Sequence, residues 1–439
     1  MKKTFIFFEA LLLLLSCVSC AGITPETETL PPFESAGPAS KTEEETIIKR
    51  NGALKDVKAV WLSQYDMLNV HLQNGKQRDE ASFRLLAADV MKNIASCGLN
   101  TVFMQIRPFG DSFYPSEFFP SSAMVTGKTG TPFAYDPLPI LINEAHGNGL
   151  SIHAWINPYR CMTVDEINNV DEKYAVRRWY DDPEKNGREV FTYNGRIYLS
   201  PAYDEPRALI LNGVNEILDA YDFDGIHIDD YFYPTTDLSA DQAAYDSYAK
   251  DFGEVGRATF RYVCVNKLVR SLYLTVKQKD KNLLFGVSPA GIIKNAYGMD
   301  FADVYTWGKE KGYVDYLAPQ LYFGLEHETA PFDRLMREWS DLTVNPEVGI
   351  IYGMTLTKAY SGTDPHAGSG QNEWSEHKDI LIRCLDLTKE VENCCGVALF
   401  SYQHLFVPGT DNVPEQTKEE LSTFLPGLKE IKWKYNNEQ

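Results

Sequence analysis

The sequence predicts an α/β fold, a (β/α)8 TIM barrel with a long insertion after the third strand. From Lys58 onward, short apolar runs alternate with segments of helical periodicity, an order typical of parallel β/α units. Eight such runs can be counted, and eight strands in one series favour a closed barrel over a doubly wound sheet. Polar and aromatic residues follow most of these runs, which is where such barrels carry their functional groups.

The predicted strands are rich in Val, Ile, Leu and Phe, as buried parallel strands are. They cover residues 58–63, 101–107, 150–156, 224–229, 283–288, 316–321, 348–352 and 397–401. Gly98 and Gly147 end the first two predicted helices, and Asp204 is the predicted N-cap of the third. The helices cover residues 83–97, 138–146, 205–221, 256–277, 331–340, 375–390 and 415–424.

The insertion runs over residues 161–199, between the third strand and its helix. Two short segments, 189–193 and 196–199, flank Asn194-Gly195, which predicts a hairpin with a tight turn. A long aromatic insertion over a barrel mouth is typical of a substrate-cleft wall, and a stabilising flap is the alternative.

The start of the chain is typical of an export signal, because a basic pair precedes an apolar run over residues 5–15 that is short for a membrane span. The Ser-Cys pairs that follow resemble a bacterial lipoprotein signal, with Cys20 or Cys17 acylated; a plain secretory signal is the alternative. We expect the protein at the cell envelope, on the periplasmic or cell-surface side, touching the membrane only through this lipid anchor. The expected organisation is a signal peptide at 1–20, a disordered tether at 21–54, the barrel at 55–425 and a tail at 426–439.

The composition narrows the range of partners. A net charge of −19 argues against nucleic acids and anionic membrane surfaces. Aromatic residues make up 13% of the chain, and many stand beside loop-forming residues, which favours carbohydrate contact. The six cysteines beyond the signal have no Cys-x-x-Cys spacing, so we expect no metal site, no cofactor and no disulfide framework.

The segment from Asp224 to Pro234 is predicted as a buried strand that ends in carboxylates and aromatic rings. Alternation places His227, Asp229 and Tyr231 on the inner face of the barrel. Asp229 is the main catalytic candidate, because a carboxylate on the inner face is costly unless it is used. His227 is either a paired core residue or a support beneath Asp229. Asp230 points outward from a regular strand, and only a bend would bring it to the site.

Similar polar and aromatic residues end other strands. Amide and guanidinium groups bind hydroxyls, and flat rings stack on sugars, so these ends suit a glycan. Each residue also has a structural alternative: pairing of Arg107 with Asp111, capping of the third strand, or closing a barrel layer. The predicted substrate-binding residues are Arg107, Tyr114, Trp155, Asn157, Arg160, His227, Asp230, Tyr231, Gln320 and Tyr322.

Five motifs occur in a specific order: Arg107-Pro108 with Gly110-Asp111 and Tyr114, Trp155-Ile156-Asn157-Pro158-Tyr159-Arg160, Asp224 to Pro234, Ser288-Pro289, and Pro319-Gln320-Leu321-Tyr322. Together they resemble the bacterial glycosyl-hydrolase-like family 10 domain over about residues 55 to 425. The resemblance implies a (β/α)8 glycosidase fold and cleavage of amino-sugar glycans such as peptidoglycan strands. Ala290 and Phe323 depart from the aromatic residue and the Trp that are common there.

Glycosidases usually use two carboxyl groups, about 5 Å apart for retention and about 6.5–9.5 Å apart for inversion. Asp229 supplies one, and Asp111 or Glu326 are the candidates for the second. Alternatively, the 2-acetamido group of the substrate is the nucleophile, with Asp229 orienting it or acting as the acid. A catalytically inactive glycan-binding lipoprotein is the rival function. A metal hydrolase is disfavoured, because no His-x-His pair ends the first strand.

Overall fold

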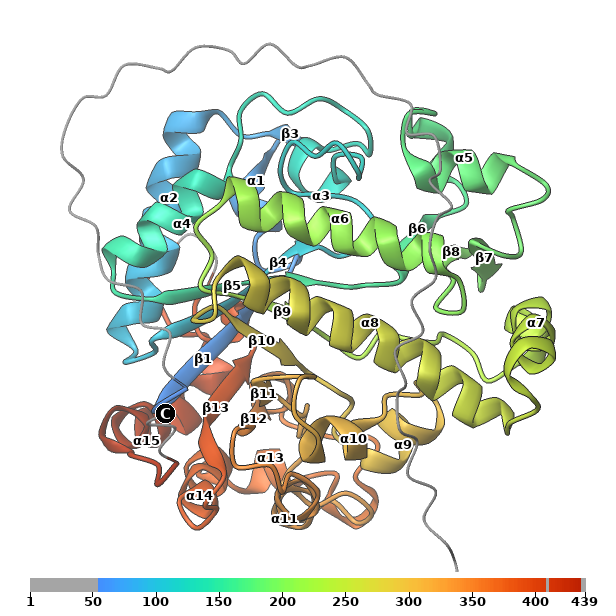
Figure 1. Ribbon diagram of the computed structural model, residues 1–439. Coiled ribbons are helices and arrows are strands. Elements are labelled where there is room, and N and C mark those ends of the chain that lie inside the picture. Colours follow the sequence, from blue (N-terminus) through green and yellow to red (C-terminus); the bar gives the residue numbers. More distant parts are fainter. Residues whose placement is uncertain (1–53, 408–409, 436–439) are drawn as a thin grey trace, which may run out of the picture. The chain divides into compact units, whose positions relative to one another are not determined.

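The computed structural model describes residues 54–407 and 410–435, in which eight parallel strands close into a barrel, as predicted (Figure 1). Around the barrel the order is β1-β13-β12-β11-β10-β9-β5-β4, and β1 closes the sheet by pairing with β4 and β13. In chain order the strands are β1 (Val57–Leu62), β4 (Thr101–Arg107), β5 (Ser151–Ile156), β9 (Gly225–Ile228), β10 (Leu284–Val287), β11 (Tyr316–Leu317), β12 (Gly349–Thr355) and β13 (Cys394–Phe400).

Alternation along the strands separates two apolar layers, because successive side chains point to opposite faces. Trp61, Phe103 and Tyr316 belong to the cluster that fills the barrel interior. Ile226 and Ile228 of β9 belong to the larger cluster beneath the helices, as the alternation predicted. The interior is therefore a packed core, and any cavity must lie above it.

Helices surround the barrel (Figure 1). The longer ones are α2 (Glu80–Ser96), α4 (Leu138–Gly147), α6 (Asp204–Ala220), α7 (Gln242–Phe252), α8 (Arg257–Lys279), α11 (Phe332–Leu342), α14 (Ile380–Thr388) and α15 (Glu415–Glu430). The shorter ones are α1 (Leu68–His71), α3 (Ala123–Thr126), α5 (Ala175–Asp181), α9 (Ile293–Gly298), α10 (Val304–Lys309), α12 (Thr357–Ser361) and α13 (Glu373–Glu376).

Two details of the predicted elements were wrong. Tyr203 is the N-cap of α6 and makes no side-chain cap, while Asp204 is the first helical residue and pairs with Arg207. The sixth strand ends at Leu317 instead of residue 321. Pro319 lacks the N–H that a continued ladder needs, and only isolated bridges from Gln320 to Ala290 and Gly353 follow.

The insertion after β5 forms a separate three-stranded sheet of β6 (Arg160–Thr163), β8 (Arg196–Leu199) and β7 (Val190–Tyr193). The predicted hairpin is confirmed: Asn194 (φ 49°) and Gly195 (φ 73°) join β7 to β8 with the two positive φ angles of a type I′ turn. The strand β6 was not predicted. It extends this sheet directly from the end of the third barrel strand, and so links the insertion to the barrel mouth.

The two ends of the described barrel meet at the amino-terminal side of the strands. Asp56, just before β1, accepts hydrogen bonds from the backbone N–H of Trp433 (3.0 Å) and from Lys432 Nζ (3.0 Å). The helix α15 continues past residue 425 to Glu430, and Trp433 and Tyr435 beyond it are buried.

The predicted signal peptide and the acylation sites Cys17 and Cys20 lie outside the described residues. None of the described helices combines the length and the apolar character that spanning a membrane requires.

Candidate active site

A cavity of about 210 Å³ opens at the carboxyl ends of the barrel strands. Seven of the residues that line it were predicted as site residues, namely Trp155, Arg160, Asp229, Asp230, Tyr231, Gln320 and Tyr322. Seven more were not, namely Trp61, Ser63, Gln64, Tyr65, Gln105, Ser288 and Phe400. The strand ends therefore converge on one site, as their polar residues indicated.

Asp229 lies at the base of this cavity and is 2% exposed. Its Oδ2 atom accepts hydrogen bonds from Trp155 Nε1 (3.1 Å) and Asn157 Nδ2 (2.6 Å). Asn157 is held in turn by Gln105 Nε2, which donates to Asn157 Oδ1 at 2.5 Å. Burial, together with the charge of Asp230, raises the pKa of Asp229 to about 8. The Asp229 carboxyl thus keeps its proton at neutral pH.

Asp230 faces the same cavity, because β9 ends at Ile228 and the chain bends out of the regular alternation. The expectation that Asp230 points away is therefore wrong, and the bend considered as the exception occurs. Burial raises the pKa of Asp230, and a hydrogen bond to Gln320 and the charge of Arg160 oppose that rise. A third acid, Asp300, lies nearby: burial and the charge of Asp230 raise its pKa to about 7.

Arg160 brings positive charge to the rim of the cavity. Its guanidinium stacks on Tyr231 (3.7 Å to the ring centre) and on Phe109 (4.8 Å), and its Nε donates to the carbonyl of Pro108 (3.2 Å). These contacts fix Arg160 in place. Its charge lowers the pKa of Asp229 and of Asp230, although burial outweighs it in both.

His227 lies in the barrel interior, as predicted, and does not line the cavity. Its Nε2 accepts a hydrogen bond from Trp61 Nε1 (3.2 Å), its Nδ1 lies 3.0 Å from the Tyr316 hydroxyl, and its ring stacks on Phe103 at 4.2 Å. Burial lowers its pKa well below the usual value, so the imidazole is neutral. His227 therefore supports the wall residue Trp61 from below.

Arg107 and Tyr114 were predicted at the site but are buried behind β4. The register of β4 against β5 shifts between Gln105 and Arg107, so Gln105 points into the barrel while Arg107 turns outward over Phe119 (4.3 Å). The missing side chain of Gly213 on α6 leaves room for it, since a Cβ there would lie 2.6 Å from Arg107 Nη1. This irregularity is not visible in the sequence.

The two candidates for a second catalytic carboxyl do not line the cavity either. Asp111 is buried and accepts a hydrogen bond from the backbone N–H of Phe109 (2.8 Å), and burial raises its pKa to about 6. The Asp111 carboxyl therefore stabilises the loop that carries it. Glu326 is half exposed, 3.5 Å from His377. Neither is placed to act on a substrate bound next to Asp229.

The cavity residues that sequence reasoning missed come mostly from the first strand. Ser63, Gln64 and Tyr65 follow β1 directly, so the strand-end argument applied to residues 58–63 would have found them. Gln105 is two residues before the end of β4, on the same face as Phe103, and alternation alone identifies it.

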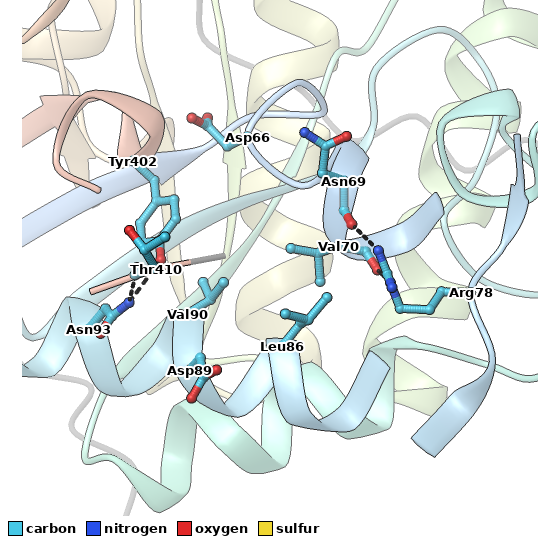
Figure 2. A pocket seen from close by; sticks show the side chains of 10 residues that line it. All are labelled: Asp66, Asn69, Val70, Arg78, Leu86, Asp89, Val90, Asn93, Tyr402 and Thr410. Carbon is cyan, nitrogen blue, oxygen red and sulfur yellow. Dashed lines mark hydrogen bonds between the residues drawn. The ribbon is translucent and has the colours of Figure 1, made fainter. Parts of the chain in front are cut away.

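A larger cavity, of about 470 Å³, lies beside α1 and α2 (Figure 2). Two of its charged groups, Arg78 and Asp66, are already hydrogen-bonded within the protein. Arg78 donates to the carbonyls of Val70 and Leu72, and both carboxylate oxygens of Asp66 accept hydrogen bonds. The smaller cavity is therefore the candidate active site, because its adjacent Asp229 and Asp230 lie at the carboxyl ends of the strands. Across the described residues there is no group of three or more His, Cys, Asp or Glu side chains suited to a metal ion.

Known proteins resemble this chain in sequence and in fold. A family model described as "Glycosyl hydrolase-like 10" matches residues 56–369. The chain is similar to "Glycosyl hydrolase YngK" of Bacillus subtilis (31% identity over 391 residues, covering 84% of this chain and 72% of that protein). It is also similar to "Glycosyl hydrolase DigH" of Escherichia coli (28% over 429 residues, covering 91% and 92%). In structure it resembles the catalytic domain of a β-amylase from Paenibacillus polymyxa (TM-score 0.53, 10% identity, covering 85% and 98%), a likeness of fold.

Proposed function

Because this chain belongs to the Glycosyl hydrolase-like 10 family, we propose that it hydrolyses glycosidic bonds in an amino-sugar-containing glycan, with peptidoglycan strands as the first substrate to test. The acidic pair, the amide groups and the aromatic walls of the cavity support this proposal.

The proposed mechanism depends on the positions of Asp229 and Asp230. Asp229 and Asp230 are the cavity's carboxyl groups within the described chain, and they are consecutive residues at the end of β9. Two catalytic carboxyls of the protein would flank the cleaved bond from opposite sides. The wall across from β9 instead carries neutral residues at the ends of β1 and β13, such as Gln64 and Phe400. A nucleophile supplied by the substrate fits this one-sided arrangement.

The unequal environments of the two acids assign their roles. Asp229, with the pKa near 8, holds the proton and donates it to the leaving glycosidic oxygen. Asp230, partly exposed, ionises first and accepts the N–H of the substrate's 2-acetamido group. The acetamido oxygen then bonds to C1 as the C1–O bond breaks. Water then attacks C1, the bond between C1 and the acetamido oxygen breaks, and the proton released by the water returns to Asp229; the acetamido group and the acid are thereby restored.

This mechanism predicts that cleavage needs the acetamido group. We expect the protein to release new reducing ends from peptide-free peptidoglycan strands or from N-acetylglucosamine oligomers. Chemically de-N-acetylated forms of the same polymers should react at least about 100-fold more slowly, because the nucleophile is removed. The measurement is a reducing-end assay on matched acetylated and de-N-acetylated samples.

Two other results are informative. Equal cleavage of both forms would contradict the role of the substrate's acetamido group and leave a nucleophile on the protein. If calorimetry detects binding of acetylated strands but no reducing ends form, the protein is a glycan-binding protein and the enzymatic proposal is wrong. The same aromatic cavity would then serve as the binding site.

We further propose that the N-terminal signal places the protein at the cell envelope through an acylated cysteine, as the Ser-Cys pairs suggest. Expressed in bacteria fed a labelled fatty acid, the full chain should incorporate label. Cys20→Ala and Cys17→Ala variants tested separately should show which cysteine carries it. Labelling that survives in the double variant would contradict acylation at either position.

A further inference from the structure

We propose that Tyr65 is a sugar-binding platform that positions a second sugar unit beside the one held over Asp229. This inference rests on the proposed function. It assigns a specificity role to a residue on the loop after β1, on the other side of the barrel mouth from Tyr231.

Tyr65 and Tyr231 stand at separate edges of the cavity. Tyr231 follows β9, and Tyr65 follows β1, three strands away around the barrel. Tyr231 is 42% exposed and Tyr65 is 58% exposed. They are the two most exposed aromatic residues that line the cavity. The ring of Tyr65 has no hydrogen bond or ring partner within the described part of the chain. A large ring left open at the edge of a polar cavity is available to stack on a sugar.

The backbone beneath Tyr65 is rigid, although its ring is exposed. Asp66 is 5% exposed, and its Oδ2 accepts from Ser63 N (2.7 Å) and Ser63 Oγ (2.6 Å). Its Oδ1 accepts from Ser401 Oγ (2.9 Å) and Gln403 N (2.7 Å), which ties the turn to the end of β13. Asp66 also stands at the edge of the larger cavity (Figure 2).

A further hydrogen bond holds the same turn: the backbone N–H of Gln64 donates to Gln105 Oε1 at 3.0 Å. Gln105 also donates to Asn157, which holds Asp229, so the turn and the acid belong to one hydrogen-bonded network. A ring on such a fixed turn can bind a sugar with little loss of backbone entropy. Its position relative to Asp229 is also set in advance.

The size of the cavity explains why a platform outside it is needed. At about 210 Å³ it lies below the roughly 300–1,000 Å³ of pockets that enclose a whole drug-sized ligand. A glycan chain therefore inserts little more than one unit, and its next units must lie across the rim. Tyr65 is the exposed ring on the β1 side of that rim.

The test compares chain lengths. With N-acetylglucosamine oligomers of two to six units, Tyr65→Ala should lose about 10-fold in kcat/KM on the long oligomers, mainly through KM, and little on the shortest that is cleaved. Tyr65→Phe and Tyr65→Trp should keep most of the activity, since the ring remains. Thermal midpoints should be unchanged. Tyr305→Ala is the matched control, because Tyr305 is 50% exposed but lies on α10 away from the cavity.

The results separate this inference from the proposed function. If the wild-type protein cleaves no oligomer and no peptide-free peptidoglycan strand, the proposed function fails, and with it this inference. If the wild-type protein cleaves and Tyr65→Ala matches it at every chain length, only the platform is overturned. An equal loss at all lengths would also overturn it, because a sugar platform acts only when a unit reaches it.

Discussion

Asp229→Asn is expected to lower kcat by about 10³-fold, within the range that a general acid contributes. The variant cannot protonate the leaving oxygen. Its amide oxygen still accepts the hydrogen bonds that Trp155 and Asn157 donate to Asp229 Oδ2, so the local geometry is kept. In the wild-type protein, activity should fall as pH rises through about 8, where Asp229 loses its proton. The reducing-end assay across pH, on peptide-free strands, measures both effects.

The stability of this variant follows from the same pKa. The pKa of Asp229 rises from 3.8 to about 8 on folding, so the folded state takes up a proton that the unfolded chain lacks between those values. This proton uptake makes folding less favourable as pH rises above 4. The amide has no proton to take up, so Asp229→Asn should be at least as stable as the wild type at pH 7.

Asp224→Asn is the matched control, because it makes the same chemical change at the opposite end of β9. Asp224 Oδ2 accepts from the backbone N–H of Ile152 (2.7 Å) and lies 2.9 Å from His146 Nε2, far from the cavity. It should retain kcat and lose some stability. Full activity in Asp229→Asn, or an equal loss in Asp224→Asn, would remove Asp229 from the mechanism.

Arg261→Ala is expected to destabilise the fold by about 3–5 kcal/mol, a large part of the 5–15 kcal/mol typical of a domain. Arg261 is fully buried and binds Asp241 through Nε (2.8 Å) and Nη2 (2.9 Å). It also donates to the carbonyls of Thr235 (3.0 Å) and Asp237 (2.6 Å). Removing it leaves the buried Asp241 carboxylate with the longer contact to Arg257 Nη1 (3.4 Å), in the segment that continues from Asp230.

The shift of the urea midpoint measures this loss. Arg84→Ala is the control, because Arg84 pairs with Glu80 on an exposed helix face and should change stability by less than about 1 kcal/mol. Replacing both buried partners, Arg261→Met with Asp241→Leu, should recover much of the loss, since the buried Asp241 carboxylate is removed together with its main partner. A midpoint unchanged in Arg261→Ala would contradict the assigned role of this pair.

The fold was largely predictable because its signals are local. Apolar runs, helix periodicity and the Asn194-Gly195 turn each reflect a preference within a few residues, and the structure confirms the barrel and the hairpin. The predicted end of a strand was wrong where a single residue prevents the strand from continuing, as Pro319 does after β11. Alternation also placed His227 and Asp229 correctly inside the barrel.

The site was only partly predictable, because it depends on where regular strands become irregular. The bend after Ile228 turns Asp230 inward, and the register shift before Arg107 turns that side chain outward. The outward position of Arg107 depends on the space left by Gly213 of α6, a distant segment that no local pattern encodes. The neutral wall opposite β9 could likewise be seen only once the barrel had been closed.

The contacts of Asp56 with Lys432 and Trp433 have a practical consequence. They join the two ends of the described chain at the side of the barrel away from the acids. An affinity tag, a fusion partner or a solid support attached directly before Leu54 or after Tyr435 would sit behind the barrel and leave the mouth clear. A protein trimmed to the described residues and immobilised at either of these two positions should therefore process long polymers as readily as the free protein does.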